Sequence, residues 1–343
     1  MKKVLALLLA IAVAGGLLSG CIRTDYNKDK IKFLASFYPI YIMALNIVDG
    51  VDGVEVNCMA EVQVGCLHDF KLSTDDMRNI EKSDGFIING AGMEGFIEDI
   101  ANKVDGLQII DSSTGIDLLA DGHHHDEDEH EHEDEHSHED EHEHEDEHSH
   151  EDEHEHEDEH SHEDEHEHAG HNHGEYNAHL WVSVANCIKQ VENITDGIVK
   201  LDPAHESEYR SNSKKYISKL TELKNEMESG LADISDRNII TFHEAFDYFA
   251  EEFKLNIVSV IEREPGSEPN ARDLASIIDL TKETGVKALF VEPQYPNTSA
   301  DIIASETDAR VYTLDPGVSG EMNKDAYIKM MKENLKVLQK ALD

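Results

Sequence analysis

Short apolar segments of four to six residues alternate along this chain with longer segments whose apolar positions repeat at helical spacing. In the first third, the expected elements are strand Ile31–Ser36, helix Tyr38–Val48, strand Val54–Met59, a helix from Thr74 capped by Ser73, strand Phe86–Asn89, helix Met93–Lys103 and strand Leu107–Asp111. Apolar strands bounded by Gly and Asp and separated by helices are typical of βαβ units with a parallel sheet. The pattern therefore predicts one α/β lobe in this part.

The same alternation starts again near position 238. The expected elements are strand Asn238–Thr241, helix Glu244–Phe253, strand Asn256–Ile261, helix Ala271–Thr284, strand Ala288–Val291, strand Arg310–Leu314 and helix Asp325–Leu342. The sequence thus predicts an α/β fold of two βα lobes with mainly parallel sheets, at residues 31–201 and 232–343.

A long helix is expected between the two lobes, at residues 202–231. Asp202 and Pro203 are typical of a helix start, and neither Gly nor Pro follows until Gly230, which is typical of a helix end. At ~1.5 Å per residue the helix would be roughly 40 Å long. A single rigid helix of this length would resist wide opening of a cleft between the lobes.

Residues 122–174 interrupt the first lobe with a tract of very unusual composition. The tract holds 19 of the 23 histidines, interleaved with Asp and Glu and without Lys or Arg, and repeats a six-residue unit from His132 to Glu167. We expect it to be disordered, because it has too few apolar residues to offset its conformational entropy. Imidazole and carboxylate side chains at this density bind divalent metals, which favours metal handling over a plain acidic spacer.

The N-terminus is typical of a secreted lipoprotein. Lys2 and Lys3 precede an apolar run from Val4 to Leu18, which is too short for a membrane-spanning helix and resembles a signal peptide. The run ends in Leu-Ser-Gly-Cys at Cys21, which resembles a lipobox and implies lipidation of that cysteine. We expect residues 1–21 to be the signal peptide, residues 22–30 a tether, and lipid rather than a spanning helix to anchor the protein.

The charge of the chain excludes one class of partner. The formal net charge is −45, and because 26 of the 74 acidic residues lie between positions 123 and 168, the rest of the chain still carries −19. No basic patch is available for nucleic acid, and the charge favours a cationic ligand.

Four histidines lie outside the tract. His68, His179 and His243 each follow an expected strand or lie in a loop, and Asp315 ends the last expected strand. Open α/β sheets bind their ligands at such carboxyl edges. Three imidazoles and one carboxylate make a complete ligand set for Zn²⁺, whereas a lone histidine at a strand end is often only structural. The fourth, His205, is expected on the exposed side of the long helix.

These residues lie in motifs that resemble a known family. His68, His179, His243 in HEAFDYF and Asp315 in TLDP occur in the order found in the metal-specific solute-binding lipoproteins of ABC importers, in particular the zinc branch. The resemblance covers nearly the whole mature chain, including the His-rich insertion and FVEPQ. It implies two α/β lobes joined by one rigid helix, with the metal in the cleft between them.

The resemblance also implies which metal is bound. Manganese relatives usually have a carboxylate where this chain has His243, and more imidazole favours Zn²⁺ over Mn²⁺. The family often has Pro directly before the first and second histidines, whereas this chain has Leu67 and Ala178. The loop that carries His68 is therefore expected to be less rigid.

An enzyme is not expected. His243-Glu244-Ala245-Phe246-Asp247 approaches the HExxH motif of zinc proteases, but Asp247 replaces the second histidine that such a site requires. A zinc ion held by three histidines and an aspartate is also closed to substrate.

The remaining cysteines leave two alternatives open. Cys58 and Cys66 could form a disulfide outside the cytoplasm, and Cys66 could instead contact a metal beside His68, whereas Cys187 is expected to be a buried thiol.

Together these features predict a monomeric, lipid-anchored, extracytoplasmic protein that captures Zn²⁺ and delivers it to an ABC-type permease and its ATPase. The alternatives are an extracellular metal buffer or adhesin-like surface protein of the same fold, or a Mn²⁺-specific importer component.

Overall fold

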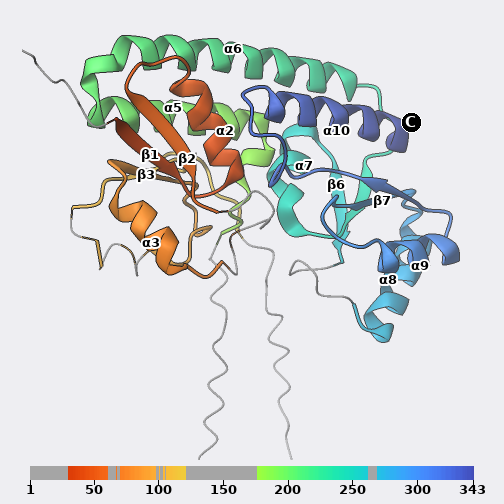
Figure 1. Ribbon diagram of the computed structural model, residues 1–343. Helices are drawn as coiled ribbons and strands as arrows, with labels where there is room; N and C mark the ends of the chain where they lie inside the picture. The colour runs from red at the N-terminus through yellow and green to blue at the C-terminus, as the bar shows by residue number, and fades with distance from the viewer. Residues whose placement is uncertain are drawn as a thin grey trace, which may run out of the picture.

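The computed structural model describes residues 30–60, 67, 70–97, 100, 103–104, 106–120, 176–261 and 269–343. The predicted signal peptide with Cys21, the tether up to residue 29, Cys66, His68 and the whole His-rich tract lie outside these residues. The described part forms two lobes, each with a four-stranded parallel sheet, so the predicted fold class is confirmed (Figure 1).

The two sheets have the same strand order, β2-β1-β3-β4 and β6-β5-β7-β8. Their strands are β1 Ile31–Ala35, β2 Val54–Cys58, β3 Gly85–Ile88, β4 Ile109–Asp111, β5 Asn238–Thr241, β6 Asn256–Val260, β7 Ala288–Val291 and β8 Arg310–Thr313. In each sheet the first and third strands of the lobe are neighbours, so the chain crosses over between strands and leaves the carboxyl ends of all four at one edge.

Helices and short 3₁₀ turns cover the sheets. They are α2 Tyr38–Ile47, α3 Thr74–Glu81, η1 Leu180–Val182, α5 Val184–Leu201, η2 Pro203–His205, α6 Glu206–Gly230, η3 Glu244–Phe246, α7 Asp247–Phe253, α8 Ala271–Thr284, α9 Thr298–Glu306 and α10 Ala326–Leu342. Ser73 caps α3 as predicted, in a reciprocal capping box with Asp76.

Two local predictions were wrong. Met93–Phe96 form turns rather than the start of a helix, because the buried Glu94 carboxylate folds back to accept hydrogen bonds from the backbone of Asn89 and Gly90. His205 is only 26% exposed, because its Nδ1 lies 2.5 Å from Asp202 Oδ2.

The long helix α6 runs across the top of both lobes, with α10 of the second lobe beside it (Figure 1). It begins at Glu206, three residues after Pro203, because the first turn is the 3₁₀ turn η2. Its buried residues Tyr209, Tyr216, Leu220, Leu223 and Met227 pack into the core. The helix is therefore a packed part of both lobes rather than a free linker.

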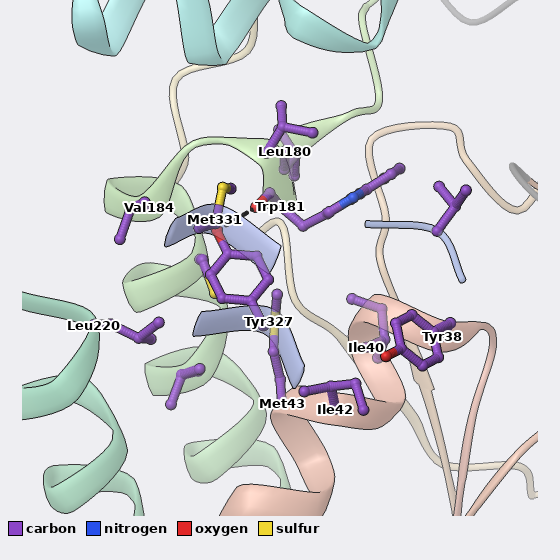
Figure 2. Packing of buried hydrophobic residues seen from close by; sticks show 14 of the residues in the cluster. Tyr38, Ile40, Ile42, Met43, Leu180, Trp181, Val184, Leu220, Tyr327 and Met331 are labelled. Carbon is purple, nitrogen blue, oxygen red and sulfur yellow. Dashed lines mark hydrogen bonds between the residues drawn. The ribbon is translucent and has the colours of Figure 1, made fainter. Parts of the chain in front are cut away.

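One hydrophobic cluster extends through both lobes. Figure 2 shows it where α2 of the first lobe meets α10 of the second, with Tyr38, Ile40, Ile42, Met43, Leu180, Trp181, Tyr327 and Met331 among its members. Trp181 is fully buried, and its ring meets that of Phe37 edge-on at 5.0 Å. Separation of the lobes would expose this shared core to water, which opposes wide hinge motion.

Hydrogen bonds reinforce the contact between the lobes. Trp181 Nε1 donates to Pro316 O at 2.6 Å, and Tyr327 Oη donates to Trp181 O at 2.8 Å. The Glu252 carboxylate of α7 accepts from the backbone of Val184 and Ala185, the first residues of α5. A carboxylate from the second lobe thus caps a helix of the first, at the end where the helix dipole favours negative charge.

Cys58 and Cys187 are free thiols in the described part of the chain, and Cys66, the possible disulfide partner of Cys58, lies outside it. Cys187 is fully buried, as predicted, and burial raises its pKa well above the usual range. Within the described ranges, no helix has the length and apolar character needed to cross a membrane.

Candidate metal centre

Three adjacent strands of the second sheet are each followed by a polar residue that can bind a cation or orient a residue that binds one. His243 lies two residues beyond β5, Glu292 directly follows β7, and Asp315 lies two residues beyond β8. Because β5, β7 and β8 are parallel neighbours, their carboxyl ends lie at the same edge. The expectation that His243 and Asp315 lie at a common sheet edge is therefore met, with a second carboxylate on the strand between them.

His243 is held by that second carboxylate. Its Nδ1 lies 2.6 Å from Glu292 Oε1, and both side chains are 2% exposed. Burial by itself lowers the pKa of His243, but the negative charge and hydrogen bond of Glu292 outweigh it, so the pKa is raised. A carboxylate on Nδ1 fixes the ring orientation and leaves Nε2 as the nitrogen that can meet a metal.

His243 Nε2 is buried and has no hydrogen-bond partner among the residues that the structure describes. Leaving a buried polar atom without a partner costs roughly 1–3 kcal/mol, so such atoms are rare and call for an explanation. A bound metal ion would be such an explanation, because a neutral imidazole can bind a metal through this nitrogen.

His179 reaches the same place from the first lobe. It precedes the 3₁₀ turn η1, is 1% exposed, and its ring lies 4.8 Å from that of His243, nearly perpendicular to it. Its Nδ1 is 3.0 Å from Asn177 Oδ1. The structure thus brings His179 and His243 together across the two lobes.

Hydrogen bonds hold the loop before His179, where the resemblance led us to expect a proline and the chain has Ala178. Ala178 is buried, and its carbonyl accepts a hydrogen bond from Asn89 Nδ2 at 2.8 Å. Asn89 is itself fully buried and accepts from Gln190. Side-chain hydrogen bonds from the end of β3 therefore fix this loop.

Asp315 is partly buried at the edge of a cavity of about 350 Å³ between α2 and α10. Its backbone is bound by Asn334 of α10, and its Oδ1 accepts from Gly317 N at 2.8 Å. Burial raises its pKa, and the nearby charge of Glu292 raises it further. A bound cation would relieve this repulsion between two carboxylates.

His68 lies outside the described residues, so the structure does not place it. Among the residues that are described, no group of three or more His, Cys, Asp or Glu side chains is close enough to hold a metal ion. His179 and His243 are together; Asp315 is at the same sheet edge but does not complete a group with them.

Sequence analysis missed two supporting residues. Glu292 directly follows the fully buried strand β7, and its position at the end of a central strand is a signal that could have marked it. Asn177 lies two residues before His179, and nothing in the sequence shows which partners its amide has.

Comparisons with known proteins agree with this architecture. Residues 34–341 match the model of a family described as zinc-uptake complex component A, periplasmic (ZnuA). The high-affinity zinc uptake system protein ZnuA of Bacillus subtilis is 31% identical over 325 residues, which cover 93% of this chain and 89% of that protein. The crystal structure of the metal-dependent lipoprotein YcdH from Bacillus subtilis has a TM-score of 0.67 at 27% identity, covering 91% of this chain and 99% of that chain.

The fold and the paired histidines define a two-lobed solute-binding protein of the metal-binding type. The chain belongs to the zinc-uptake component A (ZnuA) family. It also resembles the zinc-binding protein AdcA of Streptococcus pyogenes serotype M3, at 28% identity over 352 residues, but spans only 62% of that protein's length.

Proposed function

We propose that this protein captures Zn²⁺ outside the cytoplasm and delivers it to an ABC-type permease and its ATPase. The observation that carries the proposal is His243, which lies beside the ring of His179 and whose Nδ1 is held by Glu292. Its buried Nε2 has no hydrogen-bond partner among the described residues. A preorganised pair of imidazoles from two lobes is suited to tight binding of a small cation, because little order has to be gained on binding.

The proposed ligands are His68, His179, His243 and Asp315. Three imidazoles and a carboxylate favour Zn²⁺, which binds nitrogen ligands well, whereas Mn²⁺ prefers more oxygen. Such a set leaves no open coordination position for a substrate, which is why we propose a binding protein rather than an enzyme. The carboxyl end of β2, at Cys58, lies at the same sheet edge as that of β1, and His68 follows β2 ten residues later in the sequence.

We further propose that lipid on Cys21 anchors the protein to the membrane and that it acts as a monomer. The lipobox-like sequence before Cys21 supports the anchor. Transfer to a permease distinguishes this proposal from a metal buffer or an adhesin-like surface protein, and a permease and an ATPase encoded next to this protein would support transfer.

The tract is proposed to collect zinc for the cleft. Ala120 and Tyr176, which flank the tract in the sequence, form an isolated β-bridge. Tyr176 lies three residues before His179, one of the proposed zinc ligands. Each ion bound by a flexible segment must order backbone at ~1–2 kcal/mol per residue, so the tract sites should be weaker than the cleft.

We expect the full chain to bind one Zn²⁺ tightly and several more weakly, and a variant without residues 123–173 to keep only the tight one. Four residues would then join Ala120 to Tyr176, a length suited to a hairpin turn. Competition titration of both proteins against a zinc chelator measures this. If the variant without the tract also lacked the tight site, the proposed cleft site would be wrong. If both proteins bound the same number of weak zinc ions, the tract would not be a collector.

Zinc affinity should also depend on pH through His243. A proton on Nε2 competes with zinc, so affinity should fall as the pH falls. Because the pKa of His243 is raised above 6.5, the fall should begin at a higher pH than for an isolated imidazole.

Substitution Glu292→Gln removes the charge that raises this pKa and should move the fall to lower pH, while weakening binding at pH 8 by roughly 10-fold or more. Titrations from pH 5 to 8 test this, with Glu283→Gln on the exposed side of α8 as the control; an unshifted profile in Glu292→Gln would contradict it.

A further inference from the structure

Asn177 contacts both histidine loops with one side chain. It is 3% exposed, lies two residues before His179, and uses its amide in four close contacts. Its Oδ1 faces the backbone N and the Nδ1 of His179, and its Nδ2 faces Glu244 O and Asp247 Oδ2 in the other lobe. Glu244 directly follows His243, so a single amide lies between the two loops that carry the paired histidines.

Two of these contacts fix which way the amide points. The backbone N–H of His179, 2.9 Å away, can only donate, so the atom that faces it must be the oxygen. The carbonyl of Glu244, 2.8 Å away, can only accept, so the atom that faces it must be the nitrogen. A flipped amide would place its NH₂ group against the N–H of His179 and its oxygen against the carbonyl of Glu244.

The orientation of the amide determines the tautomer of His179. Oδ1 has no proton, so the imidazole Nδ1 that lies 3.0 Å from it must donate and must carry the ring proton. In a neutral imidazole the lone pair is then on Nε2. Asn177 thus has the same role for His179 that Glu292 has for His243, and both rings are set to bind through Nε2.

The backbone of Asn177 is fixed as well. Its N–H donates to Leu119 O at 2.9 Å, and its carbonyl accepts from Tyr248 Oη at 2.8 Å. The same hydroxyl accepts from Leu119 N at 3.0 Å, so one tyrosine of the second lobe holds both chain segments that flank the tract. Hydrogen bonds at both its N–H and its carbonyl therefore hold the backbone that carries the Asn177 side chain.

We propose that Asn177 is a positioning residue for metal binding: it sets His179 in the Nδ1–H tautomer and ties the loop of His179 to the loop of His243 across the two lobes. The inference rests on the proposed zinc site. It explains how two histidines from separate lobes are aligned before the metal arrives.

The test compares Asn177→Ala with a matched asparagine in the full chain. Asn46 is also buried, and its Nδ2 also bridges the lobes, from Ile42 O to Lys324 O, but it touches neither histidine loop. In competition with a zinc chelator strong enough to strip the tract, Asn177→Ala should weaken the tight site by roughly 10- to 100-fold, while Asn46→Ala should bind zinc like the wild type. Equal affinities in the wild type and Asn177→Ala, or an equal loss in both variants, would overturn the proposal.

A second measurement does not require a variant to fold. Long-range ¹H–¹⁵N NMR spectra of the metal-free wild type should show His179 protonated at Nδ1, and the Nε2–H tautomer there would overturn the proposal. If instead the wild type has no tight zinc site that depends on His243, the proposed function fails, whatever the tautomer of His179.

Discussion

Replacement of His243 by Ala should weaken zinc binding by about 1000-fold or more, equivalent to about 4 kcal/mol of binding free energy. The substitution removes the imidazole whose buried Nε2 has no hydrogen-bond partner in the described part of the chain, and it leaves the buried Glu292 carboxylate without the ring that it orients. Competition titration of the variant without residues 123–173 measures the effect directly.

The matched control is His205→Ala. His205 is a histidine outside the cleft, bound to Asp202 at the start of the long helix, so its loss should leave zinc affinity unchanged. Affinity of His243→Ala within about tenfold of the parent protein would remove His243 from the ligand set.

Substitution of Trp181 by Ala should lower the free energy of unfolding by about 3–5 kcal/mol. The indole is fully buried between the lobes, packs edge-on against Phe37 and donates to Pro316 O. Its removal would leave both a cavity in the shared core and a backbone carbonyl without its donor.

Urea denaturation of the metal-free protein measures this loss, with Tyr176→Ala as the control. Tyr176 lies five residues earlier and is 43% exposed, so its truncation should change stability little. A loss below about 1 kcal/mol for Trp181→Ala would mean that the lobes do not share the core through this residue.

The sequence was sufficient for the strands and for part of the site, because both follow from local patterns. Short apolar runs with β-branched or aromatic residues, such as Ala288–Val291, favour buried strands, and parallel strands bring residues that follow them, such as His243 and Asp315, to one edge. His243 follows from this rule, whereas His179 precedes a 3₁₀ turn of the first lobe, and its prediction rested on its motif and the family resemblance.

Other features depend on contacts between distant residues and could not be predicted. Helix α5 was not predicted, and it contains Gly197, which lowers helix propensity; the structure explains this glycine, since a Cβ there would lie 2.4 Å from Ile110 of β4. Asn177 and Glu292 act through partners 67 and 49 residues away. The position of Glu94, which turns Met93–Phe96 away from a helix, likewise depends on strand ends that only the folded lobe brings together.

We propose that one zinc ion lies between the lobes on a preformed pair of imidazoles. Anomalous diffraction at the zinc absorption edge, from crystals of the protein with one equivalent of zinc, tests it most directly. We predict a single strong peak at ~2.0–2.1 Å from Nε2 of both His179 and His243, with His68 and Asp315 completing the coordination. A peak bound through Nδ1 of either ring, or one outside the cleft with His179 and His243 unliganded, would contradict the account.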